Sequence, residues 1–146
     1  MANSNEEVVR RAYEFAEGKS TSVPGWRDSF TEDGVFANHA TGQSFSGESL
    51  GVVVEEMVKG FPDVHREIHS VYSVEDTVIV QLSIQGTHKG TLHSMAGPVE
   101  ATGRRLDIPC CDVFKVVDGK IDRFDCYPSG TLMLEQLGVV GAAAAR

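Results

Sequence analysis

The sequence is poor in several features that mark common functional classes. Its 146 residues contain 13 Lys and Arg against 21 Asp and Glu, so the formal net charge is -8. Binding to nucleic acid needs a surplus of basic residues to neutralise phosphates, and we therefore expect no nucleic-acid partner. The same balance disfavours an anionic membrane surface. No apolar run reaches the ~20 residues of a membrane helix, so we expect no membrane association.

Cysteine is also scarce. The three cysteines are Cys110, Cys111 and Cys126, an odd number with two adjacent, which does not form a disulfide framework. We expect reduced, buried thiols in a cytoplasmic protein. The polar, acidic segment 1–7 lacks the basic and apolar regions of a signal peptide.

Metal-binding and nucleotide-binding patterns are missing as well. There is no P-loop or GxGxxG motif. His65 and His69 would share a face of a helix, but a strand is expected here. On a strand they lie about 13 Å apart at ~3.3 Å per residue, too far to share one ion. We therefore expect no metal site.

The composition that remains fits one ordinary domain. Hydrophobic residues make up 41% and charged residues 23% of the chain, as in globular proteins. A chain of about 150 residues buries roughly two thirds of its unfolded surface without disulfides or metal. Because there is no repeat, linker or composition shift, we expect a single domain over 1–146. Its core would span about 5–140, and the Ala-rich end, 141–146, would be a frayed tail.

The first sixty residues have helical spacing. Ser4 and Glu7 form a capping-box pattern before apolar residues that recur at helical intervals. Pro24 suits the first turn of a short second helix. The segment 50–61 has the most regular amphipathic pattern and predicts a third helix. A short strand is expected at 34–38.

Beyond residue 62 the apolar period changes to two, which predicts strands at 64–74, 77–88, 104–117 and 120–127. Asp118-Gly119 is a hairpin turn, and a last helical turn follows at 132–137. Helices first and strands later predict an α+β fold with helices on one face of an antiparallel sheet. Such a fold leaves a concave apolar pocket, the usual ligand site.

Six short motifs in a fixed order resemble those of a known family. They are Phe61-Pro62-Asp63, Gly86-Thr87-His88-Lys89-Gly90, Thr102-Gly103-Arg104-Arg105, Asp112-Val113-Phe114, Asp118-Gly119-Lys120-Ile121 and Glu135-Gln136-Leu137-Gly138. With them the sequence resembles the SnoaL-like polyketide cyclases of the nuclear-transport-factor-2-like superfamily. The resemblance implies a cone-shaped α+β barrel, a strongly curved antiparallel sheet wrapped around three N-terminal helices. It also implies a hydrophobic small-molecule substrate, no cofactor, and a homodimer formed through the outer sheet face.

Asp112 is the first catalytic candidate. Alternation points it away from Lys115, which needs water, and therefore toward the helices and the pocket. Loss of hydration there raises the pKa of a carboxylate and prepares it to move a proton near neutral pH. The alternative is a structural ion pair with one of Arg104, Arg105 and Arg123.

Three further residues are catalytic candidates. His88 shares its strand parity with Leu82 and Ile84, which favours the pocket rim, where imidazole can shuttle a proton; alternatively it orders the following loop. Asp125 lies where the family often carries an acid, but its register also allows a surface role beside an Arg. Asn38 occupies a position where relatives hold the isomerase base. It cannot act as a base, so it would hold a carbonyl or a water, or form a turn.

Aromatic and aliphatic residues would line the cavity. Related isomerases place a Tyr on the first helix that donates to an oxyanion, and Tyr13 is that candidate; the alternative is a core aromatic. The other expected lining residues are Trp26, Phe36, Met57, Leu82, Ile84, Met95 and Phe114. The Gly- and Ser-rich connection 89–103 would cover the mouth as a lid or remain a disordered hairpin loop.

The resemblance favours an enzyme of antibiotic or other secondary metabolism: a cyclase or isomerase that forms a carbon–carbon bond within a polyketide-like substrate. Asp112, helped by His88 or Asp125, would move a proton, and Asn38 or Tyr13 would stabilise an oxyanion. Confinement alone can supply much of the acceleration, so a cycloaddition stays open. Epoxide hydrolysis or dehydration, using two of these acids and an Arg, is an alternative. A non-catalytic ligand-binding domain is another.

Overall fold

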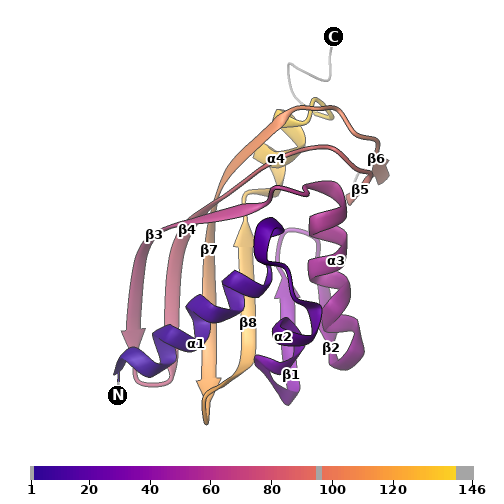
Figure 1. Ribbon diagram of the computed structural model, residues 1–146. Helices are drawn as coiled ribbons and strands as arrows, with labels where there is room; N and C mark the ends of the chain where they lie inside the picture. The colour runs from indigo at the N-terminus through magenta and orange to yellow at the C-terminus, as the bar shows by residue number, and fades with distance from the viewer. Residues whose placement is uncertain (1, 95–96, 141–146) are drawn as a thin grey trace.

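The helices and the sheet form two layers (Figure 1). The computed structural model describes residues 2–94 and 97–140. Its helices are α1 (Ala2–Phe15), α2 (Val23–Asp28), α3 (Leu50–Gly60) and α4 (Gly130–Gln136), with short 3-10 turns η1 (Gly18–Ser20) and η2 (Gly47–Ser49). The strands are β1 (Phe30–Asn38), β2 (Gln43–Ser46), β3 (His65–Val74), β4 (Thr77–Thr87), β5 (Leu92–Ser94), β6 (Gly97–Val99), β7 (Arg105–Val117) and β8 (Lys120–Pro128).

Six strands form one curved sheet in the order β2-β1-β8-β7-β4-β3. All neighbours are antiparallel except β1 and β8, which run parallel. The sheet is therefore mixed and its two edge strands do not pair. The expected α+β class, with helices covering one face of a curved sheet, is confirmed. The sequence did not predict the parallel pair, because it joins the first strand to the last and no local pattern marks it.

The long strands alternate strictly between the two faces. On β7, the buried side chains from Leu106 to Val116 occupy every second position and include Asp112, while their neighbours are exposed or half-buried. Strand β4 alternates in the same way and pairs with β7 over its whole length. Asp112 therefore faces the helices, as the alternation around Lys115 predicts.

Aromatic rings fill the space between α1, α2 and the sheet. Tyr13 meets the edges of Phe114 and Phe124 at centroid distances of 5.7 and 6.3 Å. Trp26 packs against Phe30 and Phe36 in the same edge-on manner. The Trp26 indole Nε1 donates to the carbonyl of Leu50 at 2.8 Å, which ties α2 to the start of α3. These contacts fix the helices over the sheet.

Several element boundaries differ from those that the sequence predicts. Strand β1 begins at Phe30 rather than at Gly34, and β2, which the sequence did not predict, pairs with it. The connection 89–103 contains a small antiparallel pair, β5 and β6, instead of being structureless. The tail 141–146 and Met95 lie outside the described residues. The homodimer stays a prediction. The outer face of the sheet, through which it would form, carries half-buried apolar side chains such as Ile79 and Val113.

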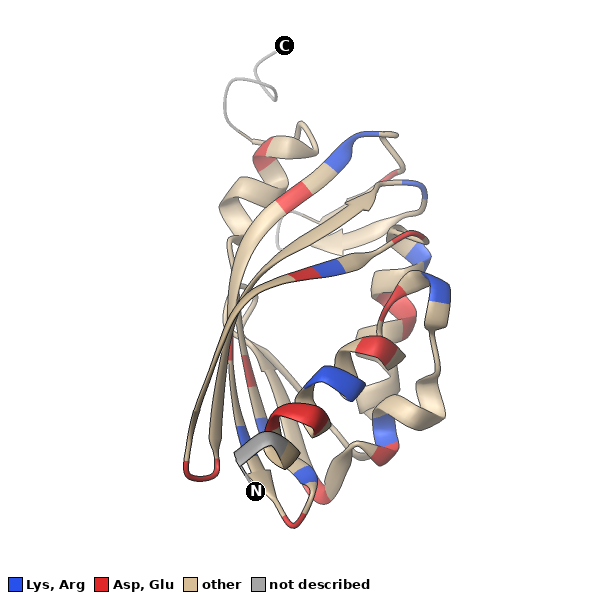
Figure 2. Ribbon diagram, turned by 60° about the vertical axis from the view of Figure 1, so that its left-hand side comes forward, with Lys and Arg blue, Asp and Glu red and all other residues tan. Residues whose placement is uncertain are grey.

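Charged residues lie along the helices, within the strands and at the turns (Figure 2). Within 2–94 and 97–140, no helix combines the length and apolar character needed to span a membrane. Among the described acidic side chains, only Glu17 and Asp112 are buried.

Gly18 makes a close backbone approach directly after α1. Its N–H donates to the carbonyl of Val64 at 2.9 Å, and a Cβ added there would lie 2.0 Å from the carbonyl oxygen of Pro62. We expect Gly18→Ala to lower the free energy of unfolding by about 1–3 kcal/mol, because backbone atoms must move apart. Urea unfolding followed by circular dichroism measures this change.

Gly60→Ala is the matched control for this substitution. A Cβ at Gly60, the last residue of α3, meets its nearest atoms at 3.8 Å, which is ordinary van der Waals contact. Helix propensity favours alanine over glycine by up to about 1 kcal/mol, so the control is expected to be neutral or slightly stabilising. Equal unfolding midpoints for the two variants would contradict the prediction.

Candidate active site

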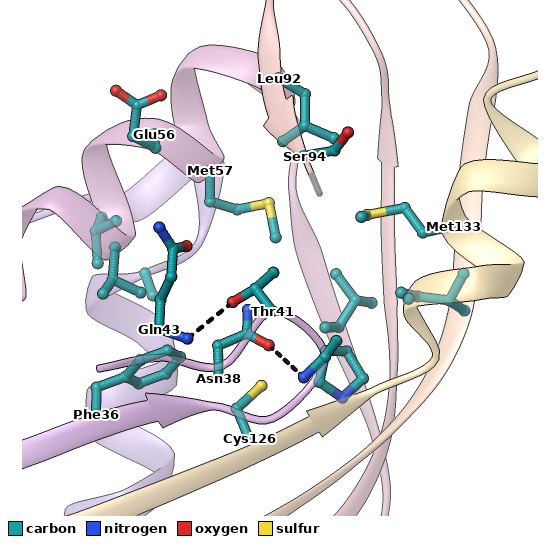
Figure 3. A pocket seen from close by; sticks show the side chains of 18 of the residues that line it. Phe36, Asn38, Thr41, Gln43, Glu56, Met57, Leu92, Ser94, Cys126 and Met133 are labelled. Atoms are coloured by element: carbon teal, nitrogen blue, oxygen red, sulfur yellow. Dashed lines mark hydrogen bonds between the residues drawn. The ribbon is translucent and has the colours of Figure 1, made fainter. Parts of the chain in front are cut away.

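A cavity of about 730 Å³ lies between the helices and the inner face of the sheet. Helices α1, α2 and α3 form one wall, strands β1, β3, β4, β7 and β8 form the other, and α4 and β5 also contribute. Figure 3 shows side chains from several elements, among them Phe36 of β1, Met57 of α3 and Met133 of α4, converging on the cavity. The lining is mostly apolar, with a few polar groups, as in small-molecule sites.

Asp112 lies in the wall of this cavity with only 2% of its surface exposed. Its Oδ2 accepts a hydrogen bond from the Tyr13 hydroxyl at 2.6 Å, and its Oδ1 accepts one from the Cys110 thiol at 3.2 Å. Burial raises the pKa of Asp112, and these hydrogen bonds together with the nearby Arg66 charge oppose the rise only in part. A carboxyl group with a raised pKa can both accept and return a proton near neutral pH.

Tyr13 remains a hydrogen-bond donor to this carboxyl group. Burial, followed by the Asp112 charge, raises the pKa of Tyr13 well above its usual value. The phenol therefore keeps its proton at neutral pH and points it at Asp112. Tyr13 also lines the cavity, so the pair is accessible from the ligand side.

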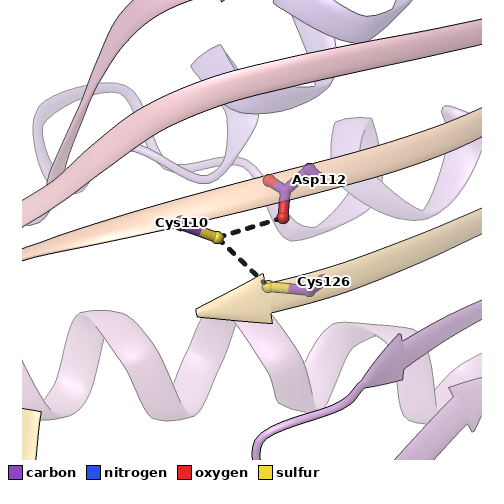
Figure 4. A group of neighbouring side chains, drawn as sticks. All are labelled: Cys110, Asp112 and Cys126. Atoms are coloured by element: carbon purple, nitrogen blue, oxygen red, sulfur yellow. Dashed lines mark hydrogen bonds between the residues drawn. The ribbon is translucent and has the colours of Figure 1, made fainter. Parts of the chain in front are cut away.

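Two thiols complete the group around Asp112 (Figure 4). Cys126 is the register partner of Asp112 on β8, and its Sγ lies 3.8 Å from that of Cys110. The Cys110 hydrogen bond and burial raise the pKa of Cys126 well above its usual value. The Cys126 hydrogen bond lowers the pKa of Cys110, but burial and the Asp112 charge outweigh it and the net pKa is raised. Both thiols therefore stay protonated and act as weak donors.

These three side chains are also the group that could hold a metal ion. Their ligand atoms lie within 4.8 Å of one another, and two thiols with a carboxylate suit a soft divalent ion. In this arrangement the groups already hydrogen-bond to one another, with Cys110 donating to Asp112. We interpret them as the polar surroundings of the acid.

Asn38 lies in the same cavity, at the end of β1 (Figure 3). Its Oδ1 accepts a hydrogen bond from the backbone N–H of Ala40 at 2.9 Å, which fixes the orientation of the amide. The Nδ2 donors form no hydrogen bond with the part of the chain that the structure describes. Asn38 is thus both a turn former and a donor available to a ligand.

The sequence also matches a known protein family. A model of the SnoaL-like polyketide cyclases matches residues 6–132. The chain belongs to this family. No curated protein gives a significant match.

Solved structures share the fold of this SnoaL-like protein. A protein from Jannaschia sp. CCS1, proposed to be a SnoaL-like polyketide cyclase, is 20% identical, with a TM-score of 0.81 and coverage of 96% of this chain and 95% of the other. IdmH from Streptomyces antibioticus, a proposed polyketide cyclase, is 22% identical at a TM-score of 0.75, covering 92% and 99%. A ketosteroid isomerase-like protein from Catenulispora acidiphila, solved with trimethylamine, is 21% identical at 0.77, covering 92% and 94%. At these identities the likeness shows the fold alone.

His88 lies away from the cavity in this family member. It is fully buried, is not among the lining residues, and stacks on Phe61 at 5.3 Å. The backbone N–H of Thr102 donates to its Nδ1 at 3.2 Å, so the ring proton resides on Nε2. That Nε2 is buried and has no hydrogen-bond partner among the described residues. The placement corresponds to the alternative in which His88 orders the loop that follows β4.

Asp125 also lies outside the group of cavity-lining residues. It accepts hydrogen bonds from Arg123 and contacts His39 Nε2 at 2.7 Å. Burial raises the pKa of Asp125, but the hydrogen bonds from Arg123 and His39 outweigh it, and the net pKa is lowered. This placement corresponds to the surface alternative, an acid that stays ionised beside an arginine.

The expected lining residues that the structure describes divide into two groups. Tyr13, Trp26, Phe36, Met57 and Ile84 line the cavity. Leu82 and Phe114 are buried in the core and are not among the lining residues. Met95 lies outside the described residues.

Among the charged residues of the cavity that sequence reasoning missed is Arg66. Its side chain lines the cavity from β3, where Arg66 pairs with Ile84 of β4. Strand alternation carries the signal, since Arg66 has the same parity as Ile68 and both are half-buried. Cys126 was likewise not proposed as a lining residue, although it faces the cavity beside Asp112.

Proposed function

We propose that this SnoaL-like protein is a cofactor-independent cyclase that closes a ring within a hydrophobic, polyketide-like substrate. The observation that carries the proposal is the Tyr13–Asp112 hydrogen bond at 2.6 Å in the wall of an apolar cavity. Membership of the SnoaL-like polyketide cyclase family supports the reaction class. Asp112 is the proposed proton-transfer group.

The proposed reaction moves one proton out and back. The Asp112 carboxylate takes a proton from the carbon between two substrate carbonyls, which leaves an enolate. The enolate carbon attacks a ketone carbon of the same molecule and forms the carbon–carbon bond. The alkoxide oxygen that results takes the proton back from Asp112. No atom is gained or lost, so the product is an isomer of the substrate.

Two neighbours have supporting roles in this proposal. Tyr13 keeps its proton and orients the carboxyl group through its bond to Oδ2. The Asn38 amide, held by its bond to the Ala40 N–H, offers its Nδ2 protons to a substrate carbonyl that gains negative charge. The apolar walls hold the flexible chain in a folded conformer, which lowers the entropy cost of ring closure.

Mass spectrometry of the product tests the proposed reaction. The probe is an aryl 1,3-diketone tethered to a second ketone, incubated with the protein and with buffer alone. We expect a ring-containing product of unchanged mass that forms faster with protein. Loss of one water would instead indicate a dehydratase and contradict the cyclase assignment as stated. Binding of the probe without any rate above buffer would favour a non-catalytic ligand-binding domain.

A further inference from the structure

The cavity contains one fixed cation whose role the proton transfer leaves unexplained. Arg66 is the only Lys or Arg among the described residues that line it. Its side chain is 12% exposed, although an arginine is always charged at physiological pH. Burial of a charge is costly unless a partner of opposite charge compensates it.

Only one nitrogen of the Arg66 guanidinium forms hydrogen bonds with the described residues. Nη1 donates to the carbonyl of Ala16 at 2.7 Å, just beyond the end of α1, and lies 3.4 Å from Glu17 Oε2. Nε and Nη2 form no hydrogen bond with any residue in the ranges 2–94 and 97–140. A guanidinium has five N–H donors in a planar fork, so the Nε and Nη2 side of the fork remains for another acceptor.

Glu17 compensates this charge only in part. Its Oε1 contacts His65 Nδ1 at 2.5 Å, and its Oε2 accepts the backbone N–H of Arg66 at 2.9 Å. The contact to the guanidinium, at 3.4 Å, is the longest of the three. Glu17 is thus shared among three donors, and its carboxylate engages Nη1 rather than the free side of the fork.

Arg66 and Asp112 lie at separate positions on the inner face. Arg66 is in register with Ile84 and, through β4, with Ile108 on β7, four residues before Asp112. Both side chains line the same cavity. The positive charge of Arg66 lowers the pKa of Asp112, although burial has the larger effect, so the two groups interact electrostatically. One ligand can therefore contact both of them.

We propose that Arg66 is an anion-binding subsite and that the ligand of this cavity is a hydrophobic carboxylic acid whose carboxylate pairs with the free side of the guanidinium. This inference rests on the proposed function only in placing the substrate in this cavity. Arginine and carboxylate form paired, parallel N–H···O bonds, which fix orientation as well as position. The carboxylate would anchor one end of the substrate while the carbon chain reaches the Tyr13–Asp112 pair.

Isothermal titration with 2-naphthoic acid and its methyl ester at neutral pH tests this subsite. The two probes share the same ring system and differ in charge. A hydrogen bond to a charged group contributes enough free energy for the wild-type protein to bind the acid at least about tenfold more tightly than the ester. In Arg66→Gln, which keeps a polar side chain but removes the charge, the acid and ester are expected to bind within about twofold of each other, with ester affinity unchanged.

Three further variants separate the possible outcomes. Arg66→Lys keeps the charge and is expected to retain part of the preference for the acid, even where Arg66→Gln folds poorly. Arg123→Gln removes an arginine outside the cavity and is expected to retain all of it. Asp112→Asn is expected to lose turnover but keep the preference, which distinguishes a failed cyclase from a failed subsite. Equal binding of acid and ester by the wild type, no measurable binding of the acid, or equal loss of both probes in Arg66→Gln would overturn the proposal.

Discussion

Asp112→Asn is expected to slow ring closure by a factor of about 10²–10⁴, the usual contribution of a positioned acid or base. Asparagine has nearly the same shape and can still accept the Tyr13 hydroxyl hydrogen bond, so the geometry of the wall should persist. The amide cannot take a proton from carbon, and the loss should appear in kcat more than in KM. Steady-state kinetics with the tethered diketone probe measure it.

Asp125→Asn is the matched control, because it removes a carboxylate of the neighbouring strand that does not line the cavity. Its turnover should stay within about twofold of wild type, as expected for a group that does not contact the substrate. Retention of full turnover by Asp112→Asn would remove Asp112 as the acid or base.

Asp112→Asn should also change how the free energy of unfolding depends on pH. The pKa of Asp112 is raised in the folded state, so the folded protein binds more protons than the unfolded chain over the interval between the two values. The contribution to stability is fully present below the unfolded pKa of about 3.9 and is lost as pH rises through the folded pKa. Asparagine does not titrate, so the stability of Asp112→Asn relative to wild type should increase with pH.

Asp125 gives the opposite sign and serves again as the control. Its pKa is lowered in the folded state, so its stabilisation is present above the unfolded pKa and is lost as pH falls through the folded one. Asp125→Asn should therefore be less stable than wild type at neutral pH and approach it in acid. Urea unfolding at several pH values compares the three proteins. Parallel pH profiles for all of them would contradict both assignments.

Phe114→Ala is expected to lower the free energy of unfolding by about 3–5 kcal/mol, the usual cost of truncating a buried phenylalanine. Phe114 is fully buried, its ring centroid lies 4.1 Å from that of Phe124, and its ring is perpendicular to that of Tyr13. Its removal leaves a void beneath α1, next to Tyr13. Denaturant unfolding measures the change.

Val113→Ala is the control for this core position. Val113 precedes Phe114 on β7, faces the other side of the sheet and is half-buried. We expect a loss of about 1 kcal/mol or less, because fewer contacts are removed. Phe114→Leu, a smaller truncation, should fall between the two even if the alanine variant cannot be purified. Similar losses for Val113→Ala and Phe114→Ala would show that Phe114 does not anchor the core.

Much of the fold follows from local pattern. Helical spacing located α1 and α3, and the change to a period of two located β3, β4, β7 and β8 within a few residues. The inward direction of Asp112 also followed from alternation, since Lys115 on the same strand must reach water. These features depend on residues that are close in the sequence, so the local pattern of apolar residues is enough to predict them.

Strand β8 contains a bulge that the local sequence pattern does not reveal. The pairing of β7 with β8 shifts between Lys115 and Val116, so Asp122 is an extra residue on β8. This bulge allows Ile121 and Phe124 both to be buried although their parities differ, and it turns Asp125 outward and Cys126 toward the cavity. A bulge depends on the partner strand, and strict alternation cannot locate it.

The sequence by itself determined the class of fold, the family and the inward direction of Asp112. Only the tertiary structure decided which inward residues meet the cavity. Leu82 and Ile84 share a face of β4, yet only Ile84 lines it, and His88 is sealed beside Phe61. Arg66 lines the cavity from β3, where alternation shows only that it shares a face with Ile68. The physical reason is that alternation specifies a face, whereas exposure to a cavity depends on how distant helices and strands cover that face.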